Sequence, residues 1–76
     1  APFERLTPRE REVLLGLVEG RSAQELAASI PVSLATVRTQ IRGILNKLGV
    51  TTQLAAVALA RRAGWPDVRD ARNHQP

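Results

Sequence analysis

Helix-start signals constrain the fold of this chain more than any other feature of its sequence. The segments TPRE (residues 7–10) and SAQE (residues 22–25) are capping boxes, in which a Ser or Thr side chain and a Glu three residues later each accept a hydrogen bond from a first-turn amide. Pro8 fits the first helical position, where a missing N–H costs nothing. Ser33 and Thr52 are residue types that cap helices, and each precedes an apolar segment. The sequence therefore predicts four helix starts.

A helix-ending residue follows each predicted helix; these residues are Gly20, Pro31, Gly49 and Gly64. Glycine adopts the left-handed conformation that closes a helix, and proline disfavours helical geometry at the residue before it, here Ile30. We expect the third helix at 34–48 and the fourth at 53–63. Because no segment alternates apolar and polar residues with a period of two, we expect no strand. The predicted fold class is all-α, with four helices.

The link between the second and third helices is very short, roughly residues 30–33. Such a link prevents long helices from stacking antiparallel and favours a steep crossing. A short helix, a tight turn and a longer helix make up the helix-turn-helix arrangement. The pattern is weak by itself, because many small bundles contain short-linked helix pairs.

The length of the chain, 76 residues, allows one small domain with little core to spare for a deep pocket. We expect a linker at 1–5, a four-helix domain at 6–64 and a polar tail at 65–76. Trp65 is expected to pack back on the domain, and disorder is expected beyond Val68.

The composition excludes several classes of function. Without cysteine, the chain forms no disulfide scaffold, no cysteine-type zinc site and no thiol nucleophile, and its only histidine, His74, makes neither a metal cluster nor a catalytic triad plausible. The carboxylates Glu10, Glu12 and Glu19 are expected on the solvent face of the first helix. No apolar segment approaches the roughly 20 residues of a membrane span. We therefore expect no enzyme, no metal, no cofactor, no small-molecule ligand and no membrane partner.

The charge is segregated along the chain. Residues 1–25 hold four basic and five acidic residues, whereas residues 26–66 hold five basic residues and no acidic one. A separate basic half indicates a polyanionic partner such as nucleic acid. A solvated arginine-rich surface is the alternative that charge alone leaves open.

The predicted helix 34–48 has two contrasting faces. Its apolar stripe consists of Val37, Ile41, Ile44, Leu45 and Leu48. The opposite face holds Arg38, Thr39 and Arg42 without any carboxylate. A major groove about 12 Å wide admits one helix, arginine binds guanine bidentately, and threonine contacts a thymine methyl. Gly43 would let a DNA backbone approach closely, and an ordinary amphipathic helix with a solvated face is the alternative.

The predicted helix 53–63 is apolar nearly all round from Leu54 to Ala60. A domain this small cannot cover one helix on every side, so this helix needs a second partner surface. A twofold contact between two copies requires only this one patch. The residues expected in the dimer interface are Leu54, Val57, Ala58 and Arg61. The alternative is that exposed alanines are tolerated and that only Ala56, Val57 and Ala60 face the core.

Four motifs carry a resemblance to a known family. They are LTPREREVL at 6–14, EGRSAQELA at 19–27, SLATVRTQI at 33–41 and LNKLGV at 45–50. In this order and spacing they resemble the LuxR/FixJ-type helix-turn-helix domain of bacterial transcription regulators, over about residues 6–64. The resemblance implies that helix 34–48 is the recognition helix and that helix 53–63 is the dimer contact.

The resemblance also implies roles for single residues. The base-reading positions are Arg38, Thr39 and Arg42, and the expected phosphate contacts are Ser33, Thr36, Gln40 and Lys47. The chain departs from the family pattern at Ala23, Pro31, Gln40 and Gly43, so the turn geometry and the half-site preference cannot be copied from relatives.

We expect sequence-specific binding of double-stranded DNA by a homodimer on an inverted repeat, as the output domain of a bacterial transcription regulator of the response-regulator kind. RNA polymerase is a further candidate partner, and the expected location is the bacterial cytoplasm, on the nucleoid when bound. A helical protein-interaction module without DNA binding is the alternative. The last domain of a sigma factor shares the first half of the pattern, but the fourth helix argues against it.

Overall fold

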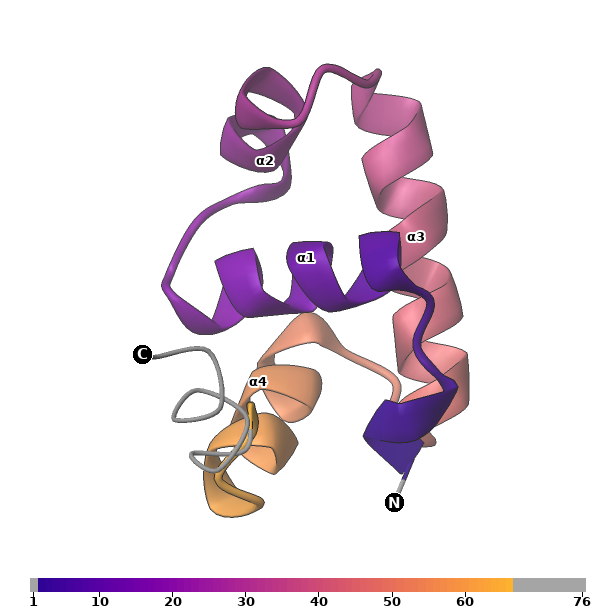
Figure 1. The fold of residues 1–76 in the computed structure, drawn as a ribbon, viewed down its shortest axis with the longest axis vertical. Helices are drawn as coiled ribbons and strands as arrows, with labels where there is room; N and C mark the ends of the chain where they lie inside the picture. Colours follow the sequence, from indigo (N-terminus) through magenta and orange to yellow (C-terminus); the bar gives the residue numbers. More distant parts are fainter. Residues whose placement is uncertain (1, 67–76) are drawn as a thin grey trace, which may run out of the picture.

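The computed structural model describes residues 2–66 (Figure 1). One 3-10 helix precedes four α-helices; the elements are η1 (Pro2–Arg5), α1 (Pro8–Val18), α2 (Ala23–Ser29), α3 (Leu34–Leu48) and α4 (Gln53–Arg62). No strand occurs within this range. The predicted all-α fold with four helices is confirmed, η1 has no counterpart among the predicted elements, and α4 ends one residue before the predicted position.

Both predicted capping boxes form. The Thr7 hydroxyl accepts a hydrogen bond from the Glu10 amide at 3.1 Å, and the Glu10 carboxylate accepts one from the Thr7 amide at 2.9 Å. Ser22 and Glu25 make the same pair of bonds at 3.1 and 2.8 Å. Gly49 closes α3 in the left-handed region, with φ of 72°. Local sequence signals thus set where these helices begin and end.

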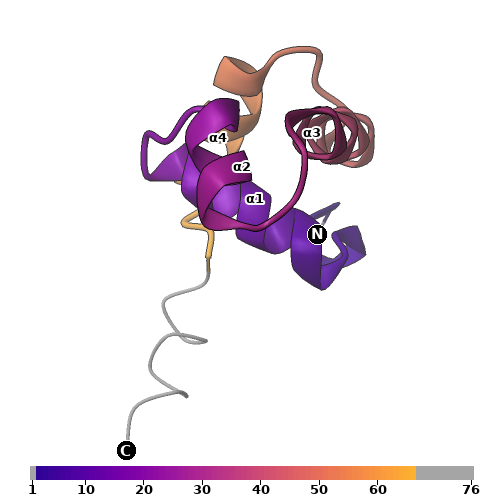
Figure 2. The same cartoon turned by 90° about the horizontal axis from the view of Figure 1, so that it is seen from above.

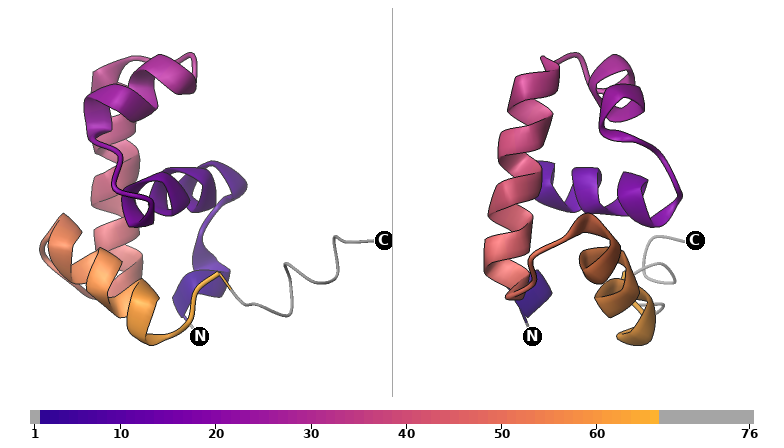
Figure 3. Two further views of the ribbon diagram at one scale, coloured as in Figure 1. Left: turned by 90° about the vertical axis from the view of Figure 1, so that its left-hand side faces the viewer. Right: turned by 180° about the vertical axis from the view of Figure 1, so that it is seen from behind.

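The helices pack around one core (Figures 1 and 3). α1 crosses the middle of α3, while α2 lies toward the start of α3 and α4 toward its end. Ile30 takes an extended conformation, with φ of −97° and ψ of 118°, as its position before a proline predicts. The chain then turns sharply into α3, so α2 and α3 form a helix-turn-helix. The largest fully buried side chains are Val13, Leu14, Leu26, Val37 and Ile44.

Two aromatic residues pack at the edges of the predicted domain. Phe3 is buried, and its ring stacks on Trp65 with the centroids 5.6 Å apart. The guanidinium of Arg11 lies 5.5 Å from the centre of the Trp65 ring. The expected packing of Trp65 on the domain is therefore confirmed. The tail beyond residue 66, including His74, lies outside the described residues.

None of the helices within residues 2–66 is long and apolar enough to cross a membrane by itself. By length and composition alone, α3 and α4 pass that test together, as a pair bent by 53°. In the fold, Ile44 of α3 and Ala56 and Ala60 of α4 are fully buried in the protein core.

Candidate nucleic-acid interface

α3 forms one edge of the molecule, and the other helices all lie to one side of it (Figure 2). Four residues of its predicted apolar stripe are buried and the fifth, Leu45, is partly buried against the core; the buried ones are Val37, Ile41, Ile44 and Leu48. The predicted base-reading residues are all exposed; they are Arg38, Thr39 and Arg42. The start of α3 is fixed by Ser33, whose hydroxyl accepts from the Thr36 amide at 3.1 Å and lies 2.9 Å from the Thr36 hydroxyl.

One flank of the outer face, here called the α4-side flank, carries two free cations. Within residues 2–66, neither Arg38 nor Arg42 forms an ion pair with a carboxylate. Both border a hollow of about 420 Å³ between α3 and the start of α4. The hollow is lined by Arg38, Ile41, Arg42, Leu45, Thr51 and Gln53. Thr51 and Gln53 were not identified from the sequence. Both follow closely after Gly49, where α3 ends and the chain changes direction, and this position could have indicated that they lie next to α3.

Thr39 uses its hydroxyl inside the helix. Its Oγ1 donates a hydrogen bond to the carbonyl oxygen of Ala35 at 3.0 Å. The hydroxyl hydrogen is thereby committed to the backbone. Thr39 can then offer an outside partner its methyl group for apolar contact, or its hydroxyl oxygen as an acceptor, but not the hydroxyl as a donor.

The other flank, here called the α1-side flank, is built differently. The Lys47 ammonium lies 2.6 Å from Oε1 of Glu10, whose side chain is only 11% exposed. A Cβ at Gly43 would lie 2.8 Å from Oε2 of the same carboxylate. Two sequence-based interpretations are therefore wrong: Glu10 is buried rather than on the solvent face, and the missing side chain of Gly43 makes room for Glu10 rather than for a DNA backbone. Glu10 and Lys47 are 37 residues apart, so no local signal pairs them.

The charge state of Glu10 follows from these contacts. Burial of the carboxylate favours its neutral form, but the hydrogen bond from Lys47, the hydrogen bonds of the capping box with Thr7 and the charge of Lys47 outweigh it and lower the pKa of Glu10 below its ordinary value of 4.5. At neutral pH the pair is therefore ionised, with one negative charge next to one positive charge.

Gln40, expected to contact phosphate, is turned partly inward. Its Oε1 is buried and has no hydrogen-bond partner among the described residues. The side chain of Gln40 must rotate before this oxygen reaches an outside ligand. Ser33 and Thr36, by contrast, are exposed at the start of α3.

The solvent-exposed surface of α4 is only partly apolar. Ala56 and Ala60 are fully buried, whereas Leu54 is 80% exposed. The other predicted interface residues are mixed: Val57 is half-buried, and Ala58 and Arg61 are exposed. The Arg61 guanidinium also donates to the carbonyl oxygen of Val18, at 3.1 Å. The patch formed by Leu54, Val57, Ala58 and Arg61 thus has one large apolar side chain that the described chain does not cover.

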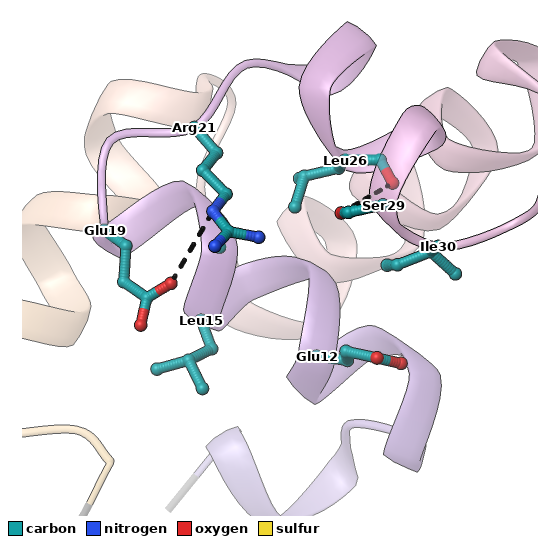
Figure 4. A pocket seen from close by; sticks show the side chains of 8 residues that line it. Glu12, Leu15, Glu19, Arg21, Leu26, Ser29 and Ile30 are labelled. Carbon is teal, nitrogen blue, oxygen red and sulfur yellow. Dashed lines mark hydrogen bonds and ion pairs between the residues drawn. The ribbon is translucent and has the colours of Figure 1, made fainter.

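A second hollow, of about 300 Å³, lies between α1 and α2 (Figure 4). Unlike the first, it combines both signs of charge. Glu12 and Glu19 line it together with Arg21, whose guanidinium lies 3.9 Å from the Glu19 carboxylate. Its apolar lining includes Leu15 and Leu26. With its cation already paired, this hollow is a poor site for a polyanion.

The fold and the uncovered basic face together define a class. A helix-turn-helix whose longer helix presents arginine and threonine outward and buries its apolar stripe is a DNA-binding domain of the transcription-regulator class. The sequence model of the luxR family of bacterial regulatory proteins matches residues 4–60, and the chain belongs to this family. Domains of the family bind DNA in transcription regulation, which agrees with the resemblance found in the sequence.

Similar proteins include complete regulators. The chain is 37% identical over 60 residues to the transcriptional regulatory protein DesR of Bacillus subtilis, covering 79% of this chain and 30% of DesR. It is 41% identical over 58 residues to the response regulator protein VraR of Staphylococcus aureus, covering 76% of this chain and 28% of VraR. The crystal structure of the response regulator ChrA of a heme-sensing two-component system superposes with a TM-score of 0.72 at 43% identity, covering 76% of this chain and 29% of ChrA. The chain spans less than a third of the length of these proteins.

Proposed function

We propose that this domain binds an inverted DNA repeat as a homodimer and reads its half-sites with α3. The observation that carries the proposal is the uncovered outer face of α3, on which Arg38 and Arg42 are exposed and unpaired within residues 2–66. Arginine is the residue that most often reads guanine in the major groove, and a free guanidinium needs no existing contact to be broken before it binds.

Phosphate contacts would come from both ends of this face. Ser33 and Thr36 are exposed at the start of α3, and Thr51 and Gln53 border the hollow near its end. Such contacts fix the register of the protein on DNA without reading sequence. Gln40 is partly buried, and it would have to make its phosphate contact through the amide Nε2, because the amide oxygen is only an acceptor.

The dimer would form through α4. Leu54 is the most exposed large apolar side chain of the described chain, and it lies on the same helix as Val57 and Ala58. An isologous contact would cover it with the same patch of a second copy. The substitution Leu54→Glu, which introduces a negative charge, should leave the melting temperature unchanged and abolish dimers on a two-half-site duplex. Sedimentation of the protein–DNA complex tests this, and a surviving dimer would place the interface elsewhere.

The longer proteins suggest the wider role. DesR is named a transcriptional regulatory protein, and VraR and ChrA are named response regulators. We place this domain at the output end of such a regulator, where it acts in the cytoplasm and on the nucleoid, with RNA polymerase as a further candidate partner.

Fluorescence anisotropy of a labelled duplex of about 30 base pairs tests the proposal. Wild type, Arg42→Ala and the matched control Arg62→Ala are titrated at about 50 and 200 mM salt, where several phosphate contacts change affinity by orders of magnitude. Arg62 is an exposed arginine on α4, so its loss removes the same charge away from α3. Salt-steep binding that Arg42→Ala weakens more than Arg62→Ala is the expected result. Absence of binding at low salt would favour the protein-interaction module instead.

A further inference from the structure

Lys47, expected from sequence to contact phosphate, is the only lysine of the chain. Its side chain is 33% exposed, so it borders the surface on the α1-side flank of α3. Its ammonium nevertheless lies 2.6 Å from the Glu10 carboxylate. A free lysine at this position would join the cations that face DNA, and the ion pair decides whether it does.

The Glu10 carboxylate is held in place by its own surroundings. Its Oε1 also accepts a hydrogen bond from the Thr7 amide at 2.9 Å, as part of the capping box that begins α1. Its Oε2 occupies the space left by the missing side chain of Gly43. These contacts hold the carboxylate at its place, so an ammonium that moves outward leaves the carboxylate behind. Moving Lys47 to a phosphate would leave a mostly buried negative charge without its partner, which is costly.

We infer that Glu10 holds Lys47 out of contact with DNA phosphates and thereby limits the affinity of the domain for random DNA. The inference rests on the proposed DNA-binding function and adds to it a residue of α1 that limits the general affinity for DNA without touching DNA. A phosphate contact strengthens binding to every sequence alike, whereas base contacts strengthen binding only to the preferred site. Neutralising one cation next to the outer face of α3 therefore lowers the affinity for random DNA and leaves the ratio of specific to random affinity unchanged.

The test compares the salt dependence of binding to a random duplex among five proteins. They are wild type, Glu10→Gln, Lys47→Gln, the double variant of these two, and the control Glu25→Gln. Glutamine also serves at the third position of a capping box, so Glu10→Gln keeps the contact with Thr7 while removing the charge. Glu25 occupies the same position in the second capping box, where its replacement changes the net charge equally but frees no lysine.

The expected pattern is specific. Each phosphate contact adds about 0.9 to the slope of log affinity against log salt, so Glu10→Gln should steepen the slope by about one. Its affinity gain over wild type should then grow about three- to fourfold between about 200 and 50 mM salt. Wild type, Lys47→Gln, the double variant and Glu25→Gln should share one slope. Because the freed lysine would contact phosphate and not a base, the ratio of specific to random affinity in Glu10→Gln should stay at the wild-type value.

Other outcomes overturn the inference. A slope that falls by about one in Lys47→Gln would show that Lys47 already contacts phosphate in the wild type. A steeper slope in the double variant would show that the lost carboxylate charge, not the freed lysine, is responsible. If Glu10→Gln does not fold, Gly43→Ala, which displaces the carboxylate by its added Cβ, must steepen the slope instead. Wild type that binds no duplex would overturn the proposed function as well, whereas wild-type binding with an unchanged slope in Glu10→Gln overturns this inference alone.

Discussion

The two flanks of α3 look alike in the sequence and differ in the structure. The α4-side flank offers Arg38 and Arg42, which have no ion-pair partner within residues 2–66. The α1-side flank offers Lys47, whose charge is matched by Glu10. One side of α3 thus presents unpaired positive charge beside a hollow, and the other presents an ion pair with no net charge beside a glycine.

The difference teaches that the charge of a helix face belongs to the fold and not to the helix alone. Counting residues of α3 gives three cations and no anion. The fourth charge comes from α1, which crosses α3 and brings its first turn against Gly43 and Lys47. A protein can therefore keep a basic recognition helix and still limit the number of cations that attract every DNA sequence.

The largest expected effect comes from breaking the α4-side flank. Arg42→Ala should lose about 1–3 kcal/mol of binding free energy on the preferred site, because a bidentate contact to a guanine is removed. Binding to random duplex should weaken much less. Competition titrations with both duplexes measure the two losses, and equal losses would mean that Arg42 contacts phosphate and not a base.

Two glycines lie at contacts between helices, and the stability of the fold should respond differently when each is replaced by alanine. Gly16→Ala would force a Cβ against the side chain of Leu26, which is only 2% exposed, so the free energy of unfolding should fall by about 1–3 kcal/mol. Gly43→Ala would instead displace the far end of Glu10, and the gain in helix propensity of about 1 kcal/mol offsets the loss of that contact. Urea unfolding of both variants tests this. A large loss of stability in Gly43→Ala would show that Glu10 cannot move.

Low pH should make the charge of the two flanks more alike, because protonation of Glu10 removes the negative charge that matches Lys47. Because the folded-state pKa of Glu10 is lowered, its contribution to stability is present above the ordinary value of 4.5 and is lost as the pH falls through the folded-state pKa below it. Thermal melts of Glu10→Gln should therefore show a weaker pH dependence than wild type in this window, with Glu25→Gln as the control. Parallel curves for wild type and Glu10→Gln would contradict the ion pair.

Much of the fold follows from local sequence. The capping boxes, Ser33, Gly49 and Pro31 predict where the helices begin and end, because each acts within one turn of chain. The exposed face of α3 also follows, since its helical spacing separates Arg38, Thr39 and Arg42 from the apolar stripe.

The sequence does not predict contacts between distant segments. Glu10 and Lys47 meet only because α1 crosses α3 at Gly43, and the pattern of charged residues along α1 placed Glu10 in solvent. Phe3 and Trp65 come from opposite ends of the described chain, and their rings stack only because the fold brings these ends together. The hollow that joins Thr51 and Gln53 to the arginines likewise depends on how α4 leaves the end of α3.

The smallest expected effect lies at Thr39, between the two flanks. Its hydroxyl donates to Ala35, so Thr39→Val keeps the outward methyl group and removes only a bond within the helix, whereas Thr39→Ser keeps the hydroxyl and removes the methyl. We expect Thr39→Val to bind the preferred site within about 0.5 kcal/mol of wild type, the range of an ordinary surface change. Thr39→Ser should lose more, and the loss should vanish on a duplex in which uracil replaces the contacted thymine, because the partner methyl is then absent. If Thr39→Val is the weaker binder, the hydroxyl itself contacts the base, either as an acceptor or after turning outward on binding.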